Sequence, residues 1–155
     1  MTALLLALTW LGGALEPKTP AEGNPRPMNL DDFFKLERIS DARISPDGRH
    51  VAYVVTVPSL TDNKSTSSIW IAEVSTGKTS QLTRSPKRDR RPRWSPDGKW
   101  VAYFQQQQQT YGVLIAPAGG GGQPRVLVQV KASINRIEFS PDGQYVLYSS
   151  NQAGS

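Results

Sequence analysis

Short apolar runs alternate with turn residues from position 41 to the end of the chain. Runs such as VAYVV (51–55) and VLIA (113–116) are apolar at successive positions, not at every second one. A strand with that pattern has both of its faces covered, because a half-exposed strand is apolar only on alternate residues. The pattern therefore predicts an all-β fold built from small sheets that pack face to face.

The tetrapeptide Ser-Pro-Asp-Gly (SPDG) occurs three times, beginning at Ser45, Ser95 and Ser140. Each copy is followed at matching offsets by the same kinds of residue, VAY at 51–53 and 101–103 and VLY at 146–148. Proline presets the second position of a type I turn, and glycine takes the left-handed conformation that completes a bulged hairpin. Each copy therefore predicts the tip of a β-hairpin.

A second hairpin follows each of the first two copies, with STGK (75–78) and GGGGQP (119–124) as its turns. Two hairpins give four strands per repeat of roughly 45 to 50 residues, which is typical of a β-propeller blade. The third copy contains only its first hairpin. We therefore predict an incomplete β-propeller of about two and a half four-stranded blades, whose repeats start near residues 41, 91 and 135. Because an open array exposes an apolar face, we expect the chain to be the front part of a longer protein.

The N-terminal residues predict a targeting segment and a linker. The uncharged run 3–15 is shorter than the ~20 residues of a membrane span and suits a secretory signal. We predict a signal peptide over 1–14, with a membrane tether or a mis-set start codon as the alternatives. Residues 15–28 contain four prolines and predict an extended linker.

One short helix is predicted over 30–38, ahead of the first repeat. Asn29 is placed to cap it, and the aspartates at 31 and 32 lie in its first turn. Its buried face is expected to be formed by Leu30, Phe33, Phe34 and Leu36. The propeller portion is therefore assigned to 29–155.

Composition excludes several kinds of chemistry. The chain has no cysteine and a single histidine, His50, which excludes disulfides, thiolate sites, cysteine nucleophiles and multi-histidine metal sites. Its formal charge of +5 is concentrated in the basic run 84–93. That run has no interleaved aromatic residue, so we predict a solvated loop between blades and no nucleic-acid partner. Contact with an anionic surface or a partner domain is the alternative.

Three further features are candidates for a functional site. The position of His50 is taken by Trp100 and Tyr145 in the other repeats, which favours a structural or solvated role. The segment 118–124 lacks the lysine and the serine or threonine of a P-loop, so we predict a hairpin turn. The glutamines 105–109 predict a polar hairpin connection.

Two acids, Glu73 and Glu138, lie on predicted strands; whether they face a central channel depends on a closed ring, which the three repeats do not define. No catalytic, cofactor-binding or metal-binding residue is assigned in this chain, and no cofactor is expected.

The three repeats resemble the SPDG propeller repeat shared by TolB-like periplasmic proteins and the N-terminal domains of the prolyl oligopeptidase family. The stretch MNLDDFFKLERISDARISPDGRHVAYVVT (28–56) looks most like the acylaminoacyl-peptidase and dipeptidyl-aminopeptidase-like members, in which a short helix leads into the first blade. The resemblance implies a seven- or eight-bladed propeller over an α/β-hydrolase domain with a Ser-Asp-His triad. It also implies that the propeller restricts access to small peptides. The chain contains no G-x-S-x-G nucleophile elbow, so no triad residue is carried over.

We therefore expect the N-terminal propeller fragment of an exported serine peptidase, periplasmic or secreted and inactive alone. Its expected partners are a C-terminal α/β-hydrolase domain, absent from this chain, and a peptide substrate in the full-length enzyme. The alternative is a non-catalytic TolB-like periplasmic propeller that binds a protein partner. A third hypothesis is a complete chain that closes a ring by oligomerisation.

Overall fold

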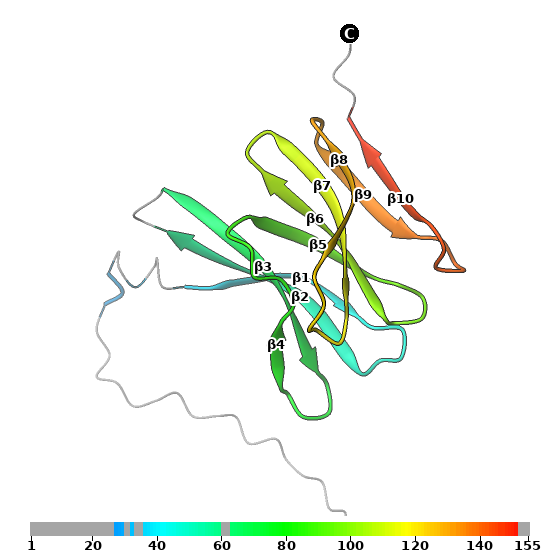
Figure 1. Cartoon of the computed structure of the whole chain (residues 1–155). Helices are drawn as coiled ribbons and strands as arrows, with labels where there is room; N and C mark the ends of the chain where they lie inside the picture. Colours follow the sequence, from blue (N-terminus) through cyan, green and yellow to red (C-terminus); the bar gives the residue numbers. More distant parts are fainter. Residues whose placement is uncertain (1–26, 30–31, 33–35, 60–62, 152–155) are drawn as a thin grey trace, which may run out of the picture.

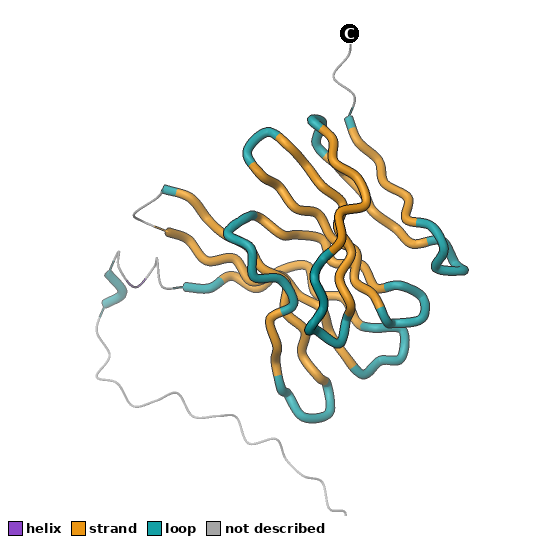
Figure 2. The backbone as a smooth tube through the Cα atoms, in the orientation of Figure 1, coloured by secondary structure: helices purple, strands orange, loops and turns teal. Residues whose placement is uncertain are grey.

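The computed structural model describes residues 27–29, 32, 36–59 and 63–151 of the 155-residue chain. The described part is almost entirely β-strand, joined by turns at the strand ends (Figure 2). The first four strands pair antiparallel in chain order and form blade 1. They are β1 (Arg38–Ile44), β2 (His50–Ser59), β3 (Lys64–Glu73) and β4 (Thr79–Gln81).

The next four strands repeat this arrangement as blade 2, and the last two form the first hairpin of blade 3. Blade 2 comprises β5 (Arg88–Trp94), β6 (Trp100–Gln107), β7 (Thr110–Pro117) and β8 (Arg125–Val130), and blade 3 comprises β9 (Ile134–Phe139) and β10 (Val146–Ser150). A single parallel bridge, Ser67 to Arg88, links blades 1 and 2. β1 contacts β5 and β5 contacts β9, so the blades fan out from their first strands (Figure 1). The predicted incomplete propeller is confirmed.

All three SPDG turns are held by the same hydrogen bonds. In the first, the Gly48 amide donates to the Ser45 carbonyl at 2.9 Å, and the Ser45 hydroxyl donates to Asp47 Oδ1 at 2.6 Å. The Asp47 carboxylate also accepts from the Arg49 amide at 3.0 Å. Equivalent bonds recur around Ser95 and Ser140. The three glycines have φ values of 70° to 71°, the left-handed conformation that the sequence predicts.

The core lies between the blades and not within one sheet. Val101 and Tyr103 of β6 pack toward blade 1, whereas the alternate residues Ala102 and Phe104 pack toward blade 3. The clusters between blades 1 and 2 contain Ala52, Val54, Ile69, Ile71, Val101, Tyr103, Leu114 and Ala116, and the cluster between blades 2 and 3 contains Ala102, Phe104, Val113, Ile134 and Ile137. Strands apolar at successive positions are therefore sandwiched between sheets, as predicted.

Successive SPDG turns also stack along one rim of the fan. A Cβ placed on Gly98 would lie 3.9 Å from Pro46 Cδ, and one on Gly143 would lie 3.5 Å from Pro96 Cδ. The second and third turns thus each pack against the proline of the preceding turn. The Trp94 indole adds a cross-blade hydrogen bond, donating to the Arg43 carbonyl at 2.8 Å.

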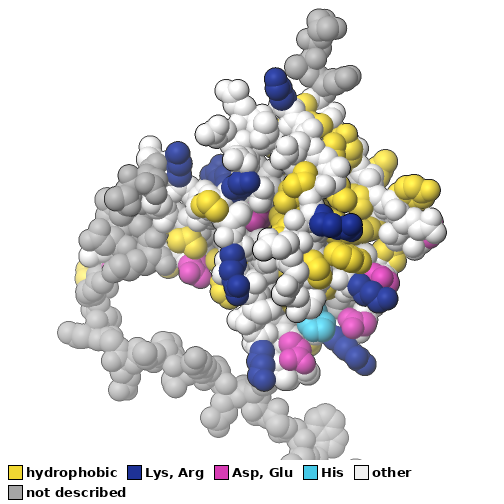
Figure 3. Space-filling model, viewed as in Figure 1, with side chains coloured by type: hydrophobic (Ala, Val, Ile, Leu, Met, Phe, Trp, Pro, Cys, Tyr) yellow, Lys and Arg dark blue, Asp and Glu magenta, His cyan; other side chains and the backbone are white. Residues whose placement is uncertain are grey.

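Blade 3 presents an uncovered apolar surface. Leu147 occupies the repeat position of Ala52 and Ala102, which are fully buried, yet 67% of Leu147 is exposed. Tyr145 is 69% exposed nearby. Figure 3 shows apolar side chains on the side of the molecule where β9 and β10 lie. In the described chain, no further sheet covers this face of β10.

The N-terminal predictions fall mostly outside the described residues. The predicted signal peptide (1–14) lies wholly outside them, and of the linker (15–28) only residues 27 and 28 are described. Asn29 and Asp32 exchange the reciprocal hydrogen bonds of a helix cap, at 2.9 and 3.1 Å. The helix prediction over 30–38 extends too far, because Leu36 and Glu37 are irregular and Arg38 begins β1. Within the described residues, no helix has the length and apolarity needed to cross a membrane.

Candidate functional site

The basic run 84–93 forms much of an inner strand, and this corrects the prediction of a solvated loop. Only 84–87 lie in the connection between blades, whereas Arg88 begins β5. Asp89, the single acid of the run, is fully buried. Strand formation follows from the repeat, because this segment leads into the second SPDG turn as β1 leads into the first.

The buried Asp89 carboxylate ties β5 to its surroundings. Its oxygens accept hydrogen bonds from the Ser85 hydroxyl at 3.1 Å and the Gln105 side-chain amide at 3.0 Å. The Lys87 ammonium in turn donates to Gln105 Oε1 at 3.1 Å. Burial raises the pKa of Asp89, while the hydrogen bond from Gln105 and those from the neighbouring hydroxyls oppose that rise. The network is structural, since it joins the connection between the blades to two strands of blade 2.

This network also corrects the prediction for the glutamines 105–109. The first three belong to β6, and only Gln108 and Gln109 form the turn, with φ of 49° at Gln108. A run of identical polar residues gave no signal that its first member contacts a buried acid.

A bulge recurs in the first strands of blades 1 and 2. Asp41 and Arg91 occupy the same repeat position, four residues before the SPDG serine, and have positive φ values of 49° and 55°. The strand register shifts at both places. Non-glycine residues rarely adopt this conformation, so the backbone is strained at the bulge. The bulge also turns both side chains out of the regular alternation of the strand.

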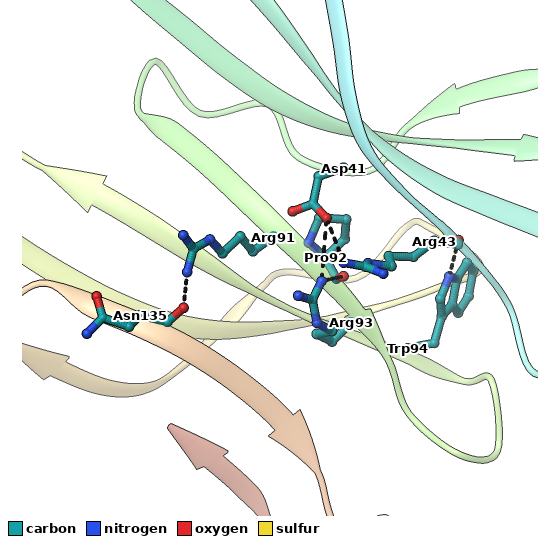
Figure 4. A network of polar contacts seen from close by, with 7 residues as sticks. All are labelled: Asp41, Arg43, Arg91, Pro92, Arg93, Trp94 and Asn135. Carbon is teal, nitrogen blue, oxygen red and sulfur yellow. Dashed lines mark hydrogen bonds and ion pairs between the residues drawn. The ribbon is translucent and has the colours of Figure 1, made fainter. Parts of the chain in front are cut away.

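The redirected Asp41 carboxylate gathers two guanidinium groups (Figure 4). It lies 3.3 Å from Arg43 on its own strand and 3.6 Å from Arg93 on β5. Arg93 also donates to the Pro92 carbonyl at 2.8 Å. Burial lowers the pKa of Arg93, and the charge of Arg43 lowers it further, while Asp41 opposes both effects.

The redirected Arg91 side chain points the other way, toward blade 3 (Figure 4). Its guanidinium donates to the Asn135 carbonyl and lies 5.6 Å from the centre of the Phe104 ring. In β9, Arg136 and Glu138 occupy the positions of Arg91 and Arg93, and the Arg136 Nε donates to Glu138 at 2.9 Å. The first strands of all three blades thus carry charged residues at the same two positions. We call these six residues the charged strip: Asp41, Arg43, Arg91, Arg93, Arg136 and Glu138.

Glu138 therefore belongs to the charged strip, but Glu73 does not. Glu73 ends β3, where it accepts hydrogen bonds from the hydroxyls of Thr76 at 2.6 Å and Ser75 at 3.1 Å. The hydrogen bond from Thr76 lowers the pKa of Glu73 most, and the one from Ser75 lowers it further. Both bonds also hold the STGK turn. Glu73 and Glu138 therefore do not lie in one site.

His50 lies at the base of the first SPDG turn, with its ring centre 6.4 Å from a ring of Trp94. The segment 118–124 forms the connection between β7 and β8, with positive φ at Gly120 and Gly121. Among the described residues, no group of three or more histidine or acidic side chains is placed to hold a metal ion. The charged strip on β1, β5 and β9 presents the kind of groups that recognise a charged ligand.

The fold and the charged strip define the class of this chain, an incomplete β-propeller of the SPDG type. No family model matches it. Among curated proteins, it is similar to the uncharacterized peptidase YuxL of Bacillus subtilis, with 32% identity over 120 residues that cover 77% of this chain and 18% of that protein. It is also similar to dipeptidyl-peptidase 5 of Porphyromonas endodontalis, with 26% identity covering 84% of this chain and 20% of that protein.

Solved structures give the same picture. The acylaminoacyl peptidase of Pyrococcus horikoshii matches with a TM-score of 0.65 and 27% identity, covering 75% of this chain and 18% of that one. The β-propeller domain of the trilobed protease of Pyrococcus furiosus matches with a TM-score of 0.60 and 26% identity, covering 75% and 34%. These findings confirm the resemblance to the propellers of prolyl-oligopeptidase-family peptidases. The matched segment spans only about a fifth of the curated peptidases named above.

Proposed function

We propose that this chain is the N-terminal propeller portion of an exported serine peptidase. In that role the propeller limits access to the active site and positions small peptides, while an α/β-hydrolase domain on the same polypeptide hydrolyses them. The observation that carries the proposal is the joint match of curated peptidases and of acylaminoacyl peptidase to the repeats. The charged strip supports it, because a strip on first strands lies where the blades converge.

The export part of the proposal rests on the apolar N-terminal run and the proline-rich segment after it. A TolB structure from Acinetobacter baumannii matches with a TM-score of 0.57 at 22% identity, which supports the fold alone.

One experiment tests both parts. The complete gene product is expressed in a Gram-negative host, and hydrolysis of a dipeptidyl chromogenic substrate is measured in the periplasmic and cytoplasmic fractions. We expect activity in the periplasmic fraction and its loss after treatment with phenylmethylsulfonyl fluoride. The 155-residue chain serves as the matched control and is expected to show no hydrolysis, because it contains no nucleophile elbow.

Inhibitor-sensitive hydrolysis by the 155-residue chain would contradict the proposal. So would a complete gene product that carries only further SPDG blades, which would favour the TolB-like alternative. Activity confined to the cytoplasmic fraction would refute export while leaving the peptidase role intact.

A further inference from the structure

A pocket opens between blades 1 and 2 beside the charged strip. Its volume is about 360 Å³, and it is lined by residues of β1, β2, β3 and β5. One wall carries hydroxyl groups, and four arginines, at 38, 88, 90 and 91, also line it. A single carboxylate, that of Asp41, is present. The pocket is therefore polar and rich in hydrogen-bond donors, and it has ample room for a small anion, since one water takes about 30 Å³ in the liquid.

The arginines on β5 lack a carboxylate of their own. Asp89 lies between two of them in sequence, but its carboxylate is buried against Ser85 and Gln105. Asp41 is engaged by Arg43 and Arg93, neither of which lines this pocket. The chain thus brings guanidinium groups together without matching acids.

The arginines differ in how they are held. Arg88 is fixed to the wall of the pocket, because its Nε donates to the Ser65 carbonyl at 3.1 Å and its Nη2 donates to the Ser65 hydroxyl. Arg91 reaches away to the Asn135 carbonyl. The side chains of Arg38 and Arg90 make no ion pair or hydrogen bond among the residues that the structure describes.

The guanidinium groups are close enough to repel one another. Burial lowers the pKa of Arg90, and the charges of Arg88 and Arg91 lower it further. A bound anion relieves such repulsion and accepts the free N–H groups, and the planar guanidinium fork matches both carboxylate and phosphate.

Hydroxyl groups complete the lining. Thr56 and Ser67 lie 3.0 Å apart on β2 and β3, and Ser65 is held by Arg88. Hydroxyls rotate to donate or accept, so they supply neutral donors beside the cations. We propose that this pocket, through Arg38, Arg88 and Arg90, binds an oxyanion, the phosphate or carboxylate group of a small ligand. The proposal does not depend on the peptidase role, because the pocket is formed by residues of this chain alone.

Binding is tested on the full 155-residue chain by isothermal titration calorimetry with inorganic phosphate, at an ionic strength held constant with sodium chloride. We expect saturable binding that Arg38→Gln and Arg90→Gln each weaken by at least about tenfold, as loss of a charge-assisted hydrogen bond implies. Arg49→Gln is the matched control. It removes one positive charge at an SPDG turn and is expected to change the dissociation constant by less than about twofold. Circular dichroism verifies that each variant is folded.

A second titration identifies the source of the oxyanion. N-acetyl-trialanine with a free C-terminal carboxylate is compared with the same peptide as its amide. Binding of the acid alone assigns the pocket to peptide carboxylates, and binding of phosphate alone assigns it to free phosphate; either result supports the proposal. It is overturned if neither probe binds, if the amide binds as tightly as the acid, or if Arg49→Gln weakens binding as much as Arg90→Gln.

Discussion

At the scale of single residues, the SPDG aspartates are fixed parts of the scaffold. The hydrogen bond from the preceding serine hydroxyl, followed by that from a backbone amide, lowers the pKa of Asp47, Asp97 and Asp142. The carboxylate of each SPDG motif therefore anchors its turn, in every blade. Its charge contributes to folding and not to chemistry.

These aspartates predict how stability depends on pH. A carboxyl whose pKa is lowered by folding stabilises the protein above its unfolded pKa, about 3.9, and that contribution is lost as the pH falls through the folded pKa. We expect the urea concentration at the unfolding midpoint of the wild-type chain to decrease as the pH is lowered from 5 to about 3. In D47N/D97N/D142N the fall should be smaller, because asparagine keeps an acceptor oxygen but does not titrate. Urea titrations at several pH values measure both.

Asp89 provides an internal contrast for that measurement. Its pKa is raised by burial, so protonation of Asp89 favours folding as the pH falls, which opposes the effect of the turns. Asp89 is present in both proteins, so their difference reports on the turns alone. Parallel pH profiles for the two proteins would refute the assignment of the turn aspartates as stabilising charges.

At the scale of elements, β5 is the strand that joins the blades. It pairs with β6, makes the single bridge to β3, and carries Asp89 into the network with Ser85 and Gln105. The sequence predicted the hairpins because turn chemistry is local and is stated three times. It did not predict this network, because the contact of Gln105 with Asp89 depends on the pairing of two strands.

Replacement of Asp89 tests how much this hydrogen-bond network stabilises the protein. Asp89→Ala removes the carboxylate that accepts hydrogen bonds from the partly buried Ser85 hydroxyl and Gln105 amide, and we expect a loss of about 1–3 kcal/mol in the free energy of unfolding. Asp89→Asn keeps the size of the side chain and one acceptor oxygen, so its loss should be smaller. Urea unfolding at pH 7 compares the two variants. Equal losses would contradict this expectation, because they would show that the acceptor oxygen kept by asparagine contributes nothing to stability.

The charged strip shows the same limit of sequence reasoning. The repeat alignment places Asp41, Arg91 and Arg136 at one position, but it does not show that the first two have positive φ or that their side chains point in opposite directions. The basic run was predicted to be a solvated loop because charged side chains are mostly exposed to solvent. The repeat predicts RPRW (91–94) as the strand that enters the second SPDG turn, but it does not show that this strand begins at Arg88.

At the scale of the whole molecule, the fan of blades leaves one apolar face uncovered. The repeat position that is fully buried as Ala52 and Ala102 is held by Leu147, which is 67% exposed. Inside the fan that position packs against the next blade, so the surface around Leu147 has the character of an interior face. An exposed patch of this kind drives association in water.

We therefore expect the 155-residue chain to self-associate as its concentration rises, in sedimentation velocity experiments. Leu147→Asp should weaken this association by roughly tenfold or more, because burial of a leucine side chain is worth about 1.5–3 kcal/mol. Val74→Asp is the matched control, since Val74 is 58% exposed but follows β3 at the STGK turn. A wild-type chain that remains monomeric at all concentrations, or equal effects of the two variants, would show that the face of β10 is not the associating surface. A weakened association in Leu147→Asp alone would assign the associating surface to this face of β10.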